Sequence, residues 1–201
     1  MVSEDEAFAW AIDLETTGLS AREDVPLEVG IKLIGGEGYV YDEFHALVWE
    51  ETDDFQRAVA RGKFNQYVNP MHTASGLWMD LENIPHADLE VHSRKFVDQE
   101  MARWVQSFDL PPLPLLGNSI GSLDRPFVLE HFPMFNEATS YRNIDISTIK
   151  ELCKKHNPVL FENLKPIIGT KEDALHRVMS DIDACILEYR AYIDNFFFIE
   201  D

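Results

Sequence analysis

Hydrophobic residues in the first fifty positions follow strand-like patterns in three segments. Residues 7–14 form a compact apolar run, and residues 25–34 and 39–49 are apolar and largely alternating. Runs of this length and pattern are typical of β-strands. Three glycines within residues 35–38 separate the last two segments, and glycine adopts the positive φ angles of tight turns at little cost. The pattern predicts three strands, with a hairpin turn between the second and the third.

The middle of the chain changes from irregular to helical patterning. Residues 50–93 are polar and aromatic without a sustained period, which predicts short helices at most. Over residues 94–108 the apolar positions recur at helical spacing. These positions are Val97, Met101, Trp104, Val105 and Phe108. Pro111 and Pro112 end that helix, and residues 113–116 predict a short buried strand.

The remaining segments predict helices that alternate with one short strand. Asp124 is placed as the N-cap of a helix with Pro126 in its first turn. Residues 143–146 predict a strand, and Ser147 is placed as the N-cap of the next helix. The last helix has the clearest apolar stripe. The stripe consists of Leu175, Val178, Ile182, Cys185, Ile186, Tyr189 and Ile193.

We find no repeat, linker or low-complexity tract, so the pattern predicts one α/β domain over residues 1–201. Hydrophobic residues make up 45% of the chain, enough for a sizeable core. The two cysteines, Cys153 and Cys185, lie in segments of helical spacing and are expected to be small buried hydrophobes in a reducing compartment. The sequence shows neither a signal peptide nor a membrane span, which predicts a soluble cytoplasmic protein.

Charge narrows the possible partners. Seventeen Lys and Arg face 36 Asp and Glu, a formal net charge of −19. A long nucleic-acid duplex is an unfavourable partner for such a chain, because its binding depends on phosphate neutralisation by Lys and Arg. An anionic membrane surface is disfavoured for the same reason.

Two of these carboxylates stand at the end of the first predicted strand. Asp13 and Glu15 are two residues apart, so on a strand they point to the same face and can reach the same divalent cations. Acidic residues before a turn are also common as solvated surface. The apolar run before them predicts a central buried strand, where paired carboxylates are costly without cations.

Two further acidic residues and a histidine have open interpretations. Asp124 is explained by its N-cap position alone. Asp181 lies on the border of the core stripe of the last helix, where an unpaired charge is unfavourable, whereas Asp183 falls on the solvated side. His176 is five residues before Asp181, just ahead of that helix or in its first turn.

Together these residues resemble a known nuclease superfamily. The pattern Asp13-x-Glu15, Asp124, and His176 five residues before Asp181 resembles the histidine-containing branch of the DEDD 3′→5′ exonucleases, and within it the oligoribonuclease family. The similarity extends through segments 13–19 (DLETTGL), 72–77 (HTASGL), 117–121 (GNSIG), 141–148 (YRNIDIST) and 176–182 (HRVMSDI). The resemblance implies a ribonuclease-H-like α/β fold, a five-stranded mixed sheet flanked by helices.

The resemblance also implies a mechanism. Asp13, Glu15, Asp124 and Asp181 would hold two Mg²⁺ or Mn²⁺ ions against the last phosphodiester of a short RNA, as carboxylates suit such cations. His176 would be the general base for the attacking water, since imidazole exchanges protons near neutral pH. A histidine with a purely structural role at a helix start is the alternative. The products would be 5′-mononucleotides.

Substrate contacts follow from the same resemblance. Leu19 would wedge against a base, His72 would contact one, and Tyr67 would stack where the family usually has Trp. The residues that would cap the terminal 5′ phosphate, and so limit the substrate to about two nucleotides, are Ser119, Arg142 and Ser147. Oligoribonucleases are homodimers, so Tyr141 is predicted to reach the partner subunit.

Three other functions stay open at this point. The segment around Ser119 fits G-x-S-x-G, and Asp145 or Asp173 with His176 would complete a serine-hydrolase triad. An acidic binding module could keep the fold without turnover. Within the superfamily, a DNA-proofreading or tRNA-trimming exonuclease would act on longer substrates.

Overall fold

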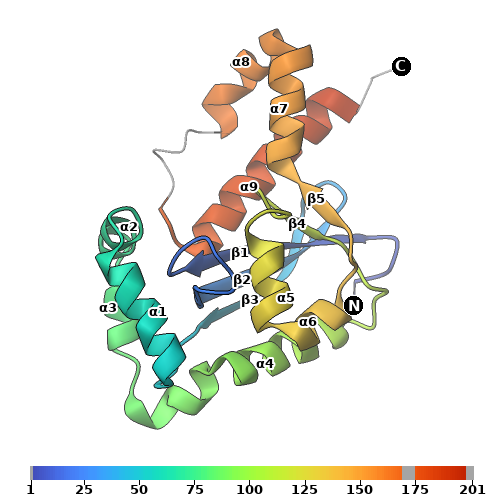
Figure 1. Ribbon diagram of the computed structural model, residues 1–201. Helices are drawn as coiled ribbons and strands as arrows, with labels where there is room; N and C mark the ends of the chain where they lie inside the picture. The colour runs from blue at the N-terminus through green and yellow to red at the C-terminus, as the bar shows by residue number, and fades with distance from the viewer. Residues whose placement is uncertain (1, 169–174, 198–201) are drawn as a thin grey trace.

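The computed structural model describes residues 2–168 and 175–197, and five of their segments form one sheet (Figure 1). The strands are β1 (Ala7–Thr16), β2 (Pro26–Gly35), β3 (Val40–Leu47), β4 (Leu115–Gly117) and β5 (Asn143–Asp145). Their order is β3-β2-β1-β4-β5. Strand β2 is antiparallel to both β1 and β3, whereas β4 is parallel to β1 and β5. The predicted five-stranded mixed sheet is confirmed.

The predicted hairpin between the second and third strands is also present. Backbone hydrogen bonds of 2.9 Å run from Gly35 N to Tyr39 O and from Gly38 N to Gly35 O. Gly38 has a φ of 77°, which glycine adopts without steric cost. The loop therefore returns β3 directly alongside β2.

Helices cover both faces of the sheet (Figure 1). The first group is α1 (Asp53–Phe64), α2 (Val68–Ala74), α3 (Leu77–Glu82), the 3₁₀ helix η1 (His86–His92), α4 (Arg94–Gln106), α5 (Asp124–His131) and α6 (Pro133–Ala138). The second group is α7 (Ile146–His156), α8 (Pro158–Ile168), α9 (Val178–Tyr192) and the π-helical turn η3 (Ile193–Phe197). Helices α1 to α6 contribute to the core on one face, and α7, α8 and α9 build the core on the other.

Alternation along β1 separates these two cores. Trp10 and Ile12 point into the core under α4, whereas Ala9 and Ala11 point into the core under α9. Side chains of a strand alternate between its two faces. The odd-numbered residues that follow, Asp13 and Glu15, therefore continue the face that α9 covers.

Small side chains on that face let α9 approach the sheet closely. Gly30 is the register partner of Asp13 across the β1–β2 pair. A Cβ atom built on Gly30 would lie 2.9 Å from side-chain atoms of both Ile182 and Val178. The glycine thus leaves room for the first turns of α9 beside the end of β1.

The predictions for two helix starts differ in outcome. The last helix begins at Val178, so His176 lies just ahead of it, one of the two positions predicted, because His176 has a left-handed φ of 52° and Arg177 is extended. Helix α7 begins at Ile146, and its N-cap is Asp145, whose side chain accepts a hydrogen bond from Thr148 N at 3.3 Å. The predicted N-cap, Ser147, lies within the helix instead.

Two expectations from composition can be compared with the structure. Both Cys153 and Cys185 are free and buried, as predicted. Among the described residues, no helix is both long enough and apolar enough to cross a membrane.

The close contact at Gly30 yields a prediction about stability. Gly30→Ala is expected to lower the free energy of unfolding by about 1–3 kcal/mol, because the added methyl group overpacks the buried contact with α9. Urea unfolding measures the change. Gly36→Ala is the control, since a Cβ there would meet nothing within 4 Å. Equal stability of the two variants would contradict this account of the contact.

Candidate metal and catalytic site

The first two site residues come from the end of β1. Glu15 is buried and Asp13 is half-buried, and both point toward the face that α9 covers. Across the sheet, Glu15 pairs in register with Glu28 of β2, which is also buried. Three carboxyl groups therefore gather at one end of the two central strands.

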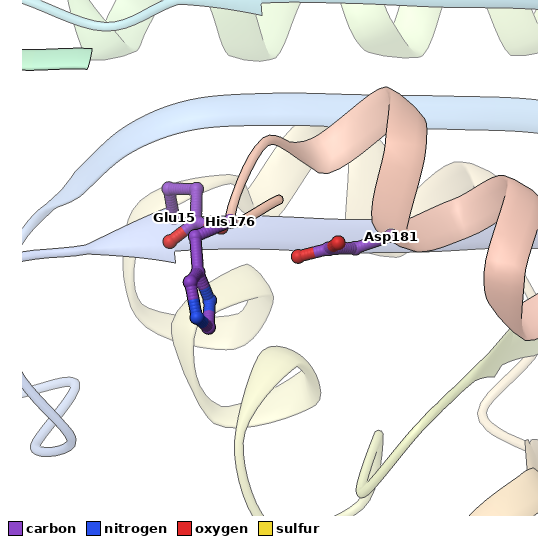
Figure 2. A group of neighbouring side chains, drawn as sticks. All are labelled: Glu15, His176 and Asp181. Carbon is purple, nitrogen blue, oxygen red and sulfur yellow. The ribbon is translucent and has the colours of Figure 1, made fainter. Parts of the chain in front are cut away.

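The start of α9 supplies the next two residues. Asp181 is in the first turn of the helix, and His176 precedes the helix by two residues. One ligand atom from each of Glu15, His176 and Asp181 lies within 4.8 Å of the other two. Figure 2 shows the three side chains gathered where β1 meets the beginning of α9. Their spacing suits coordination of one cation. Among the described residues, no other group of three His, Cys, Asp or Glu side chains has this spacing.

Asp124 reaches the site from α5. It is the first residue of that helix, the N-cap position is Leu123, and no side chain caps the helix. The predicted N-cap role of Asp124 is therefore wrong. Its side chain instead accepts a hydrogen bond from Leu14 N at 3.2 Å, and the residue is 1% exposed. This bond holds the Asp124 carboxylate beside β1, next to Asp13.

Burial and mutual repulsion raise the pKa values of these acids. Burial, followed by the charges of Asp124 and Glu15, raises the pKa of Asp13 well above its usual range. Burial, followed by the charge of Asp181, raises the pKa of Glu15 to about 8. Burial raises the pKa of Asp124 to about 7 and also raises the pKa of Asp181. The folded chain thus concentrates negative charge that protons or cations must offset.

The donor set fits a hard divalent cation. Four carboxylates offer only oxygen ligands, which Mg²⁺ and Mn²⁺ prefer, and no cysteine is among them. Carboxylates with raised pKa values also gain most from a bound cation, because metal binding replaces the proton. The site therefore has the composition of a divalent-metal centre.

The predicted base-contacting residues differ in exposure. Leu19 is 81% exposed and Tyr67 is 77% exposed, so both are accessible to a ligand. His72 is fully buried, and its Nε2 lies 2.9 Å from the carbonyl oxygen of Thr16. Its Nδ1 lies 3.7 Å from a carboxylate oxygen of Glu15. A contact between His72 and a base stays a prediction, and it requires movement of the residues that enclose the ring.

The predicted phosphate-capping residues are only partly assembled. Ser119 donates its backbone N–H to Ser147 Oγ at 3.1 Å, and the two hydroxyl oxygens are 3.3 Å apart. Arg142 is exposed and lies over the ring of Tyr141, at 5.4 Å from its centroid. No hydrogen bond joins Arg142 to either serine in the part of the chain that is described.

The geometry does not support the serine-hydrolase interpretation. The hydroxyl of Ser119 faces Ser147, and Asp145 accepts hydrogen bonds from the backbone of Ser119 and of Thr148. Within the described residues, no hydrogen bond joins Ser119 to a histidine. The other acid considered for that triad, Asp173, lies outside the described residues.

Sequence reasoning missed Glu28 and Arg177. Glu28 is a charged residue on a strand that is buried along its whole length, and it shares its face with Gly30 and Lys32. Charged residues are almost never fully buried unless they are paired. Glu28 and Lys32, two charged residues in an otherwise apolar segment, could therefore have indicated that β2 contacts charged partners.

Solved structures share this fold. The zinc-bound complex of E. coli exonuclease I with single-stranded DNA matches with a TM-score of 0.60 at 16% identity, over 96% of this chain. Exonuclease I of Methylocaldum szegediense matches with a TM-score of 0.63 at 15% identity, over 94% of this chain. The chain spans only 41% and 40% of those two proteins. The class defined by the fold is the ribonuclease-H-like class to which these exonucleases belong.

Sequence relatives extend over nearly the whole chain. The oligoribonuclease of Colwellia psychrerythraea is 34% identical over 98% of this chain and 99% of its own length. The probable oligoribonuclease of Dictyostelium discoideum is 32% identical over 90% of this chain and 86% of its own length, and the mitochondrial oligoribonuclease of Mus musculus is 28% identical. No family model matches the chain. The chain belongs to the oligoribonuclease family.

The raised pKa values predict a pH-dependent stability. With divalent ions removed by EDTA, the free energy of unfolding is expected to fall by a few kcal/mol between about pH 5 and about pH 8. The folded-state pKa values of Glu15 and Asp124 lie above their values of 4.5 and 3.8 in the unfolded chain. The folded chain therefore retains protons that the unfolded chain has lost, so rising pH favours unfolding. Urea unfolding across this range measures the slope.

Two comparisons sharpen that measurement. Glu15→Gln is expected to flatten the slope, whereas Glu51→Gln, at an exposed position, is expected to keep it. Added Mn²⁺ should stabilise the wild type more at the upper end of the range, because its ligands bind in the deprotonated form. A Glu15→Gln variant whose slope equals that of the wild type would contradict the raised pKa of Glu15.

Proposed function

We propose that this chain is a 3′→5′ exoribonuclease that hydrolyses very short RNA, dinucleotides above all, to 5′-mononucleotides. Residues 1–201 are proposed to act as one exonuclease domain. The observation that carries the proposal is the convergence of Glu15, His176 and Asp181 within 4.8 Å at the end of β1. Membership in the oligoribonuclease family supports the same function.

Two Mg²⁺ or Mn²⁺ ions are proposed as cofactors. Asp13, Glu15, Asp124 and Asp181 would hold them, and the burial of these carboxylates supports that role. Such ions, when bound, stabilise the charge that develops on the attacking and leaving oxygens of a phosphodiester. The protein residues supply the positions of the ions and the proton transfers.

His176 is proposed as the general base. Its imidazole is half-buried next to Glu15 and Asp181, where one ring nitrogen can accept the proton of the attacking water. The water oxygen forms a bond to the terminal phosphorus, and the bond from phosphorus to the 3′ oxygen breaks. That oxygen takes a proton from a water molecule and leaves as a 3′-hydroxyl, and the released product is a 5′-mononucleotide.

The substrate would be held at its bases and at its far phosphate. Leu19 and Tyr67 are exposed hydrophobic side chains, and stacking on an aromatic ring is worth about 1–3 kcal/mol per base. Ser119, Ser147 and Arg142 would cap the terminal 5′ phosphate, with the two serines already adjacent. A capped phosphate leaves room for few nucleotides, which supports a preference for short RNA.

The proposal predicts a defined activity. With Mn²⁺ and a 5′-labelled diribonucleotide, the wild type is expected to release mononucleotides, and Asp13→Ala is expected to lose at least about 100-fold of kcat, because it removes a proposed metal ligand. Glu51→Gln is the matched control for loss of a carboxylate, and it is expected to behave as the wild type. Chromatography of the labelled products measures the rates.

Three outcomes of that assay would contradict the proposal. A folded wild type that leaves the diribonucleotide intact would indicate an acidic binding module without turnover. Hydrolysis that survives EDTA but is blocked by a serine-directed phosphonate would indicate a serine hydrolase. Longer RNA or DNA processed as fast as dinucleotides would indicate a proofreading or tRNA-trimming exonuclease.

A homodimer is proposed, in which Tyr141 reaches the site of the partner subunit. Tyr141 is 83% exposed within one chain, which supports a role in contacts with another molecule. Tyr141→Ala is expected to lower turnover of the diribonucleotide by about 10-fold or more, since one stacking contact is lost. Sedimentation velocity measures the oligomeric state in the same samples. A fully active monomer would contradict the dimer.

A further inference from the structure

A cluster of charged residues next to the proposed site joins β2, α3 and the start of α9. Arg177 donates from Nε to both carboxylate oxygens of Glu28, at 3.1 and 3.0 Å, and from Nη2 to Oε1 at 2.9 Å. Its Nη1 donates to Asp80 of α3 at 2.8 Å. His45 of β3 lies 2.8 Å from the same Glu28 carboxylate. The guanidinium group thus bridges two acids from different elements.

The cluster fixes the point at which α9 begins. Arg177 follows His176 and precedes Val178, the first residue of the helix. The backbone N–H of Val178 also approaches Glu28 Oε2, at 3.5 Å. Glu28 is 1% exposed and is the register partner of Glu15. The start of α9 is therefore attached to the strand position directly beside a proposed metal ligand.

His176 needs such an attachment. Its φ of 52° is unfavourable for a residue with a side chain, and this backbone conformation persists only where the neighbouring structure holds it. Arg177 is the next residue, in an extended conformation, and its side chain has two acidic partners. A planar guanidinium holds a carboxylate in one orientation, which a flexible ammonium group does not.

We propose that Arg177 is a positioning residue for His176. By binding Glu28 and Asp80, it holds the backbone of residues 176–178 so that the imidazole stays beside Glu15 and Asp181. Arg177 acts through His176 and does not contact the reacting phosphate. The inference rests on the proposed function, because the position of His176 affects turnover only if His176 takes part in the reaction.

A second ion pair provides a matched control. Lys32 of β2 lies 2.5 Å from Asp183 of α9, so this pair joins the same strand to the same helix farther from His176. Asp183→Asn breaks the pair and leaves Lys32 with Glu43 at 3.4 Å. Asp183→Asn therefore shows the effect of losing an ion pair between β2 and α9 while the Arg177 contacts are kept.

The test compares Arg177→Met, Arg177→Lys and Asp183→Asn with Mn²⁺ and the diribonucleotide. Arg177→Met is expected to lower kcat by about 10-fold or more, with KM changed by less than about 2-fold, because a displaced general base slows the reaction without weakening binding. Arg177→Lys keeps the positive charge without the planar guanidinium group. Its kcat is expected to lie between those of the wild type and Arg177→Met. Asp183→Asn is expected to keep the wild-type kcat.

A readout independent of activity accompanies the kinetics. Hydrogen exchange at the amides of residues 175–178 is expected to accelerate in both Arg177 variants, with the rest of α9 as protected as in the wild type. Asp183→Asn should leave exchange at 175–178 unchanged. In the His176→Ala background, Arg177→Met should cost no further kcat, because residues that act as a unit are not additive.

Defined results would overturn the inference. An Arg177→Met enzyme with wild-type kcat and unchanged exchange at 175–178 would contradict it, even if the variant were less stable. If Arg177→Met lowered kcat equally in the wild-type and His176→Ala backgrounds, Arg177 would not act through His176. Full activity of His176→Ala would instead refute the proposed role of His176, and the exchange measurement would still decide whether Arg177 orders this segment.

Discussion

Repulsion among buried carboxylates is the constraint on which this site depends. The alternation of β1 turns Asp13 and Glu15 toward the face covered by α9, and the close approach of that helix at Gly30 brings Asp181 to the same place. Asp124 adds a fourth acid through its bond to the β1 backbone. Burial and like charges raise the pKa values of all four. Among the described residues, these acids therefore form a position where bound divalent cations would relieve an existing electrostatic cost.

Nearby charges show how the fold limits that cost. Glu28 is as buried as Glu15 and Asp124, yet its pKa is lowered, because hydrogen bonds from His45 and Arg177 outweigh the effect of burial. Its charge is thus balanced within the protein, whereas the charges of Asp13 and Glu15 are not. Glu28 is therefore part of a structural ion pair, whereas Asp13 and Glu15 have a negative charge that a bound cation would balance. Cations bound there would make the site locally positive, so a small anionic substrate is compatible with the net charge of −19.

The sequence predicted the strands better than it predicted the long-range contacts that join the elements. Strand alternation and the Asp13-x-Glu15 spacing are local, so they identify the sheet and one acidic pair without knowledge of the fold. The sequence left the start of α9 open between two positions around His176, because local spacing does not show the contact that Arg177 makes with a strand about 150 positions away. The N-cap role assigned to Asp124 failed for the same reason: a long-range bond to Leu14 took precedence over local capping.

The location of the divalent ions tests this account most directly. Crystals grown with Mn²⁺ and a nucleoside 5′-monophosphate, measured near the manganese absorption edge, would reveal the ions by anomalous scattering. The account predicts anomalous peaks within coordination distance of carboxylate oxygens of Asp13, Glu15, Asp124 and Asp181, with the imidazole of His176 beside them. Manganese bound only elsewhere, or its absence from these carboxylates at saturating concentration, would contradict it.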